Sequence, residues 1–148
     1  MKPQQALAIG GLFSILIGLL HGAMIFAGPE AYIYFGAGKE MADGDAAGSI
    51  LPDLLTLFIA VVFVGFGWYA FSGIGRVRRL PALKGVLIFI TSIFLLRGLG
   101  VLFDVYSFVS TSDYPFRNII FSLVSLVTGI FYGLGVYGLY FATHTKKP

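Results

Sequence analysis

Four long apolar runs, separated by short segments that carry most of the charge, constrain this chain more than any other feature. The runs cover about residues 6–27, 53–73, 82–105 and 116–142. A helix needs roughly 20 apolar residues to cross a hydrocarbon layer about 30 Å thick, and it satisfies its backbone hydrogen bonds within one segment. With 57% hydrophobic and 11% charged residues, the composition lies outside the range of soluble domains. We therefore predict an all-α membrane protein, a bundle of four transmembrane helices that forms one domain over residues 1–148.

The charged residues predict how the four helices cross the membrane. Three segments hold basic residues and no acid: the N-terminus with Lys2, the connection 76–84, and the C-terminal pair Lys146 and Lys147. All seven acids lie in or beside the two remaining gaps, together with Lys39 and Arg117. Because cytoplasmic loops of membrane proteins are enriched in Lys and Arg, both termini are predicted to be cytoplasmic (N-in/C-in). The small size and this layout favour a bacterial inner membrane.

Arg97 needs an explanation because it lies within the third apolar run. Counted from Lys84 at ~1.5 Å per residue, it is roughly 20 Å along the helix. A charge at that depth costs at least ~2.5 kcal/mol unless it faces a partner or a polar interior. Asp104 follows on the same helix face, but not at the i+3 or i+4 position of a direct pair. We expect Arg97 to pair with Asp53 or Glu30, and next with Asp104 through water.

Other polar residues reach the same level. His21 and Arg97 each lie seven residues, about 10 Å, below the expected outer ends of their helices. In the fourth run, Ser122 and Ser125 come to a similar depth. This layer predicts an outward-facing intramembrane pocket with acids around its mouth. The residues of this polar pocket are His21, Glu30, Asp53, Arg97, Asp104, Ser122 and Ser125.

Three functions for such a pocket stay open. The first is a binding site for a lipid-like or amphipathic small molecule whose polar head pairs with Arg97; because of the surrounding acids, a zwitterionic or neutral head suits it as well as an anionic one. The second is an accessory subunit of a larger membrane complex, in which the charges only set helix register. The third is a membrane enzyme acting on lipid, for which His21 with Asp53 or Glu30 is the available acid–base pair. We assign no catalytic residue.

Small residues recur every four positions in two of the apolar runs. This spacing allows a second helix backbone to approach closely. We expect these faces to contact helices of the same chain, with a second copy of the chain or a larger complex as the alternative partner and membrane lipids around the remainder. The predicted packing residues are Gly10, Ser14, Gly18, Gly22, Gly129 and Gly133.

Several kinds of chemistry are excluded by what the chain contains. The absence of cysteine excludes disulfides, thiolate metal sites and thiol redox reactions. The net charge of +3 comes from loops that membrane topology explains, so no nucleic-acid partner is expected. Haem held by two histidines of one chain is not expected, because His144 and His21 are predicted to lie on opposite sides of the membrane. A zinc site would need His21, Glu30 and Asp53 to converge, and we predict neither a metal nor another cofactor.

The segment 36–49 is rich in glycine, alanine and aspartate, and is predicted to be mobile. Within it, Asp43-Gly44-Asp45 resembles the start of a calcium loop, but the remaining ligand positions are missing. We therefore interpret these two acids as solvated.

Overall fold

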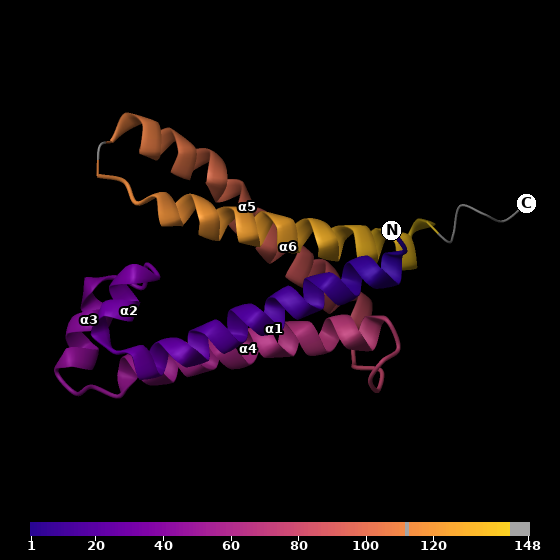
Figure 1. Cartoon of the computed structure of the whole chain (residues 1–148). Helices are drawn as coiled ribbons and strands as arrows, with labels where there is room; N and C mark the ends of the chain where they lie inside the picture. The colour runs from indigo at the N-terminus through magenta and orange to yellow at the C-terminus, as the bar shows by residue number, and fades with distance from the viewer. Residues whose placement is uncertain (112, 143–148) are drawn as a thin grey trace, which may run out of the picture. The chain divides into compact units, whose positions relative to one another are not determined.

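The computed structural model describes residues 1–111 and 113–142, and these residues form helices and no strands. Four of the helices are long and apolar enough to cross a membrane, which confirms the predicted all-α class with four candidate spans. Lys146, Lys147 and His144 lie outside the described residues. In chain order the helices are α1 (Pro3–Ala27), α2 (Pro29–Tyr34), α3 (Lys39–Ala46), α4 (Leu51–Gly73), α5 (Leu83–Ser110) and α6 (Phe116–Tyr140) (Figure 1).

The third long helix extends further than the apolar pattern indicated. α5 ends at Ser110, whereas the sequence placed its end near Val105. The reason is that Asp104 does not mark the helix end: its side chain is buried at 7% exposure and accepts hydrogen bonds from hydroxyl groups. A carboxylate satisfied in this way can remain inside a helix that continues past it.

Two short helices, α2 and α3, occupy the connection between the first two long helices. Neither was predicted. α3 lies within residues 36–49, where the glycine content indicated a mobile segment, and α2 precedes that segment. Gly38 (φ 98°) and Gly48 (φ 75°) flank α3, so these glycines provide the left-handed conformations at its boundaries rather than interrupting it. Tyr32 and Ala42 pack with Met24 in a small apolar core, which stabilises both short helices.

The chain divides into two compact units. The hairpin unit consists of Met1–Phe13 and Phe66–Pro148 and contains α5 and α6 with the ends of α1 and α4. The loop unit, Ser14–Gly65, contains α2 and α3 with the remaining halves of α1 and α4. Each unit has its own buried residues. The single domain remains a prediction.

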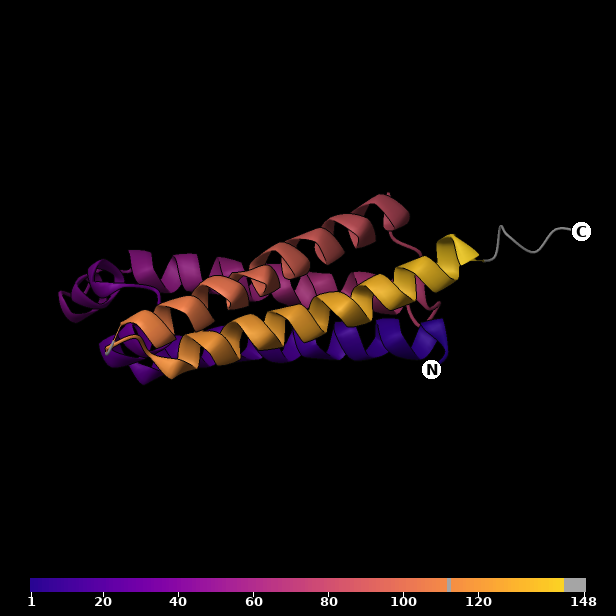
Figure 2. The same ribbon diagram turned by 90° about the horizontal axis from the view of Figure 1, so that it is seen from above.

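In the hairpin unit, α5 and α6 cross and pack closely (Figures 1 and 2). Gly98 of α5 lies against the backbone of Leu126, and Gly129 of α6 lies against Leu95. Close approach of this kind requires residues without side chains. Tyr132 is fully buried beside Gly10, and its O–H donates to the Phe66 carbonyl over 2.9 Å.

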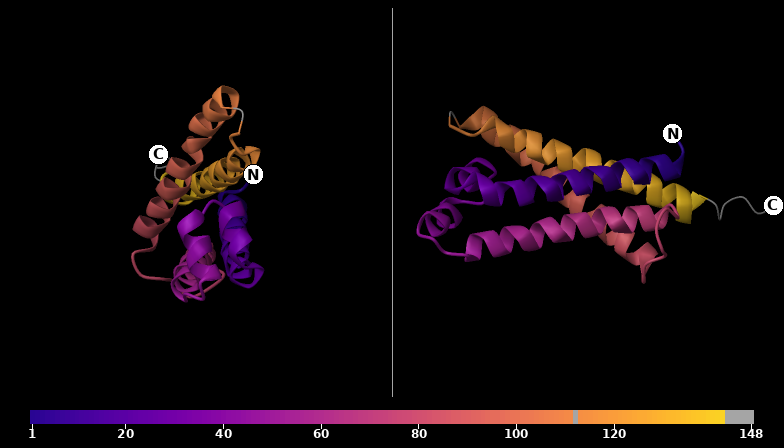
Figure 3. Two further views of the ribbon diagram at one scale, coloured as in Figure 1. Left: turned by 90° about the vertical axis from the view of Figure 1, so that its left-hand side faces the viewer. Right: turned by 60° about the horizontal axis from the view of Figure 1, so that its bottom comes forward.

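In the loop unit, α2 and α3 lie beside the end of α1 and the start of α4 (Figure 3). Gly18 of α1 lies against the Ala60 carbonyl and Val64 of α4. Ser14 is fully buried, whereas a Cβ atom on Gly22 would meet no atom within 4 Å.

In the hairpin unit, Gly133 is in ordinary contact with Thr91. Most of the small residues predicted to pack helices therefore lie against this chain itself.

Candidate functional site

A polar cluster connects α5, α6 and the turn between them in the hairpin unit. Nη1 of Arg97 donates to Oγ of Ser122 over 2.6 Å, and the Ser122 hydroxyl donates to the Asp104 carboxylate. The Tyr114 hydroxyl donates to the other carboxylate oxygen over 2.5 Å. The serine hydroxyl thus bridges the guanidinium and the carboxylate. We call these four residues the Arg97 cluster.

The acidic side of the Arg97 cluster is shielded. Asp104 is nearly buried and Ser122 is fully buried. A buried carboxylate is tolerated when hydrogen bonds and a nearby cation compensate its charge. Two hydroxyl donors and the bridged guanidinium provide this compensation here. The cluster therefore holds one positive and one negative charge in balance.

The basic side of the cluster is open. Arg97 is an exposed residue, and its Nη1 lies beside Gly100, three residues toward the C-terminal end of α5. A guanidinium has five N–H donors, and one of them is used by Ser122. The arginine consequently presents further donors at the surface of the hairpin unit, near the middle of a helix long enough to span a membrane.

Tyr114 belongs to the cluster and was not among the predicted pocket residues. Its pKa is raised, chiefly because its hydroxyl donates to the Asp104 carboxylate. The phenol therefore stays protonated and remains a donor at neutral pH. A usable signal was its position in the turn before Pro115, where the chain returns toward the level of Asp104.

Ser125 is not part of the Arg97 cluster. Its hydroxyl donates to the Phe121 carbonyl of its own helix over 3.0 Å. Of the seven residues predicted for the polar pocket, the structure thus brings together Arg97, Asp104 and Ser122. The link between Arg97 and Asp104 passes through a serine hydroxyl, whereas a bridging water was predicted.

Three predicted pocket residues belong to the loop unit. The His21 ring N–H donates to the Ile17 carbonyl one turn earlier, over 2.8 Å, and the ring packs against Phe63. Asp53 accepts a 2.8 Å hydrogen bond from the Tyr32 hydroxyl. Glu30 is exposed in the first turn of α2. The expected pairing of Arg97 with Asp53 or Glu30 stays a prediction.

Tyr32 and Asp53 hold the short helices against α4. Tyr32 is fully buried, and burial is the main cause of its raised pKa. Its hydroxyl therefore stays a donor to Asp53, so this contact is structural. Across residues 1–111 and 113–142, no three His, Cys, Asp or Glu side chains are placed to hold a metal ion.

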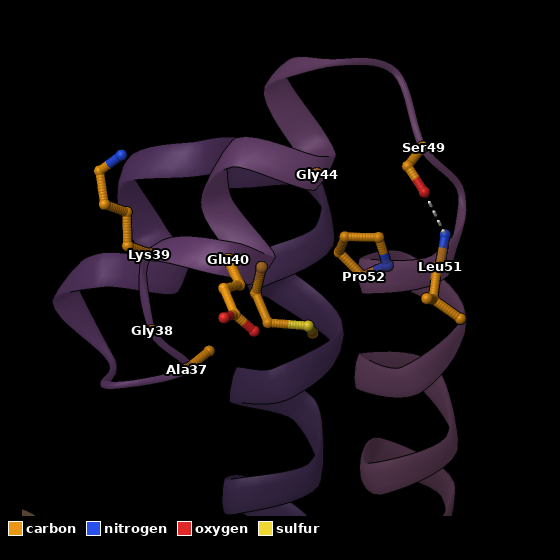
Figure 4. A pocket seen from close by; sticks show the side chains of 9 residues that line it. Ala37, Gly38, Lys39, Glu40, Gly44, Ser49, Leu51 and Pro52 are labelled. Atoms are coloured by element: carbon orange, nitrogen blue, oxygen red, sulfur yellow. Dashed lines mark hydrogen bonds between the residues drawn. The ribbon is translucent and has the colours of Figure 1, made fainter.

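Each unit has a surface cavity, and no residue of the Arg97 cluster lines either of them. The larger, about 550 Å³, lies between α3 and the start of α4 and is lined by Lys39, Glu40 and Pro52 among others (Figure 4). Its wall is stabilised by the Leu51 N–H, which donates to the Ser49 hydroxyl over 3.3 Å. The smaller cavity, about 370 Å³, lies beside the connection between α4 and α5. None of the seven predicted pocket residues lines either cavity.

Comparison of the chain with models of known protein families, with curated proteins and with solved structures found no match.

Proposed function

We propose that this chain is a bacterial inner-membrane protein with both termini in the cytoplasm, and that its Arg97 cluster binds the polar head of a lipid-like or amphipathic small molecule. The exposed guanidinium of Arg97, supported by Ser122 within a candidate membrane span, is the observation that carries the proposal. The distribution of basic residues supports the orientation. Four long apolar helices support the membrane location.

Arg97 has more N–H donors than the one that Ser122 accepts. A guanidinium in hydrocarbon persists when an acceptor meets its N–H groups. Asp104 already receives hydrogen bonds from Ser122 and Tyr114, and Ser122 meets one N–H of Arg97. A ligand oxygen in contact with the remaining N–H groups would complete the site. The balanced charge of the cluster favours a neutral or zwitterionic head.

The depth of Arg97 narrows the ligand class. Arg97 lies 14 residues after Leu83 and 13 before Ser110, about 20 Å from either end of α5 at 1.5 Å per residue. Ordinary phospholipid phosphates lie at the membrane surface. A small molecule whose polar head enters the hydrocarbon region, such as a quinone, therefore fits this position better.

The experiment compares ligand retention by matched variants of the full chain in a neutral detergent. Arg97→Leu should lose a molecule that native mass spectrometry detects on the wild type, and should lose thermal stabilisation by an added short-chain quinone. Arg97→Lys should recover part of both, because a single charge remains. Ser125→Ala is the control, since the Ser125 hydroxyl bonds to its own helix. Unchanged retention in Arg97→Leu would reject the binding role.

An accessory-subunit role has weaker support. Gly10, Gly18 and Gly129 lie against residues of this chain, so a partner would have to bind elsewhere on these faces. Gly22 is the predicted packing residue that leaves open space within 4 Å of its Cβ position. The enzyme hypothesis has no comparable observation in its favour, because the ring N–H of His21 bonds to its own helix and Asp53 bonds to Tyr32.

A further inference from the structure

The connection between α4 and α5 is held by specific hydrogen bonds. The hydroxyl of Ser72, a buried residue near the end of α4, accepts from the Leu80 N–H over 2.9 Å and donates to the Arg78 carbonyl over 3.1 Å. These two bonds fix the backbone on both sides of Arg79. The basic connection is therefore ordered around Arg79, which is exposed.

A cavity of about 370 Å³ adjoins this ordered connection. Arg79 and Lys84 supply cationic side chains to its wall, and Leu80 and Leu83 supply apolar ones. The ammonium group of Lys84 lies 4.2 Å from the centre of the Phe141 ring, a cation–π contact that keeps it near the end of α6. The wall thus combines two cations with an apolar floor.

The position of the cavity indicates its surroundings. It lies where α4 has ended, α5 begins and α6 approaches its end at Tyr140. All three helices are long and apolar enough to span a membrane, so their ends lie at a membrane surface. Residues 76–84 contain four cations and no acid. Basic pockets at the ends of membrane helices suit anionic lipid headgroups.

We propose that this cavity binds the phosphate head of an anionic glycerophospholipid. Arg79 and Lys84 contact the phosphate oxygens, while Leu80 and Leu83 contact the first carbons of the acyl chains. The site is separate from the Arg97 cluster: Lys84 and Arg97 are 13 residues apart on α5, roughly 20 Å along the helix. The inference therefore rests on the proposed membrane location but is independent of ligand binding at the Arg97 cluster.

The test measures lipid selectivity of the full chain in a neutral detergent. Native mass spectrometry follows binding of phosphatidylglycerol and of phosphatidylcholine with the same acyl chains. The wild type should prefer phosphatidylglycerol, and the double variant Arg79→Gln/Lys84→Gln should bind it roughly tenfold or more weakly, because both cations that face the phosphate are lost. Arg76→Gln/Arg78→Gln removes the same charge outside the cavity wall and should retain the preference.

A second variant tests the space in the cavity without changing its charge. Gly85 also lines the cavity, and a Cβ atom there would meet no atom within 4 Å. Gly85→Leu should fill space in the cavity, keep every cation and still reduce phosphatidylglycerol binding. It should not impair folding, because leucine favours a helix more than glycine does.

Three results would overturn the proposal. Equal losses in the two double variants would show a diffuse charge effect. If the wild type showed no preference for phosphatidylglycerol, the cavity would not be a site for anionic lipid. Displacement of the lipid by an equal concentration of inorganic phosphate would indicate a site for free phosphate. Arg97→Leu should leave phosphatidylglycerol binding unchanged, so that failure of this inference and failure of the Arg97 site remain distinguishable.

Discussion

The hairpin unit and the loop unit each contain an aspartate that accepts a hydrogen bond from a tyrosine. The two carboxylates differ in the other groups that stabilise their negative charge. Asp53 lies in the first turn of α4, where free backbone N–H groups and the positive end of the helix dipole favour a negative charge. Tyr32 is its side-chain donor. Asp104 lies inside α5, where backbone N–H groups are already paired. Ser122, Tyr114 and the bridged Arg97 compensate its charge.

Position within a helix decides how many side chains a partly or fully buried acid requires. A carboxylate at a helix start is partly stabilised by the backbone itself. A carboxylate in the interior depends on side chains from other elements, and those side chains then become fixed in place. Asp104 is in the interior of its helix, and the side chains that compensate its charge form a cluster that connects α5 and α6 and leaves Arg97 exposed.

The largest difference is expected from matched substitutions of the two acids. Asp104→Asn should lower the free energy of unfolding by about 2 kcal/mol or more, because Arg97 loses its compensating charge. Asp53→Asn should cost about 1 kcal/mol, the value of one exchanged hydrogen bond. Unfolding followed by circular dichroism in mixed micelles measures both. Equal costs would contradict the distinction between a helix start and a helix interior.

Glycine substitutions in the packed helices should also affect the stability of the two units differently. A Cβ atom on Gly98 would overlap the backbone of Leu126, so Gly98→Ala should destabilise the protein by about 1–3 kcal/mol. Gly22→Ala meets open space and should be neutral or slightly stabilising, because alanine favours a helix. The same unfolding assay compares them. A neutral Gly98→Ala would show that α5 and α6 do not approach as closely as described.

The smallest effect concerns alkaline pH. The pKa values of Tyr32 and Tyr114 are raised in the folded protein. Their stabilisation is therefore complete below the unfolded-state value of about 10 and is lost as the pH rises through the folded-state pKa. Melting temperature between pH 8 and 11 should fall less steeply in Tyr32→Phe and in Tyr114→Phe than in the wild type. Tyr32→Phe should change the slope more, because Tyr32 is fully buried.

A slope in Tyr32→Phe equal to that of the wild type would contradict this prediction. It would show that the hydroxyl of the buried tyrosine does not govern the alkaline transition of the loop unit.

The apolar runs alone were sufficient to predict four candidate membrane helices, and the lone arginine in the third run was sufficient to mark a polar site. Residue counting also placed Ser122 near the level of Arg97. Hydrophobicity is summed over about 20 residues, so a few misassigned positions do not change the result. A charge within such a run is conspicuous for the same reason, since at that depth it is costly unless a partner or a polar interior compensates it.

Only the tertiary structure decided which groups meet. It joined Arg97 to Asp104 through the Ser122 hydroxyl and added Tyr114. It also extended α5 to Ser110, formed the unpredicted helix α2, and placed α3 in a segment expected to be mobile. These outcomes depend on the rotation of each helix about its axis and on shifts of a few ångströms. Hydrogen bonds require donor and acceptor atoms about 3 Å apart, and residue spacing along one chain does not determine such distances between helices.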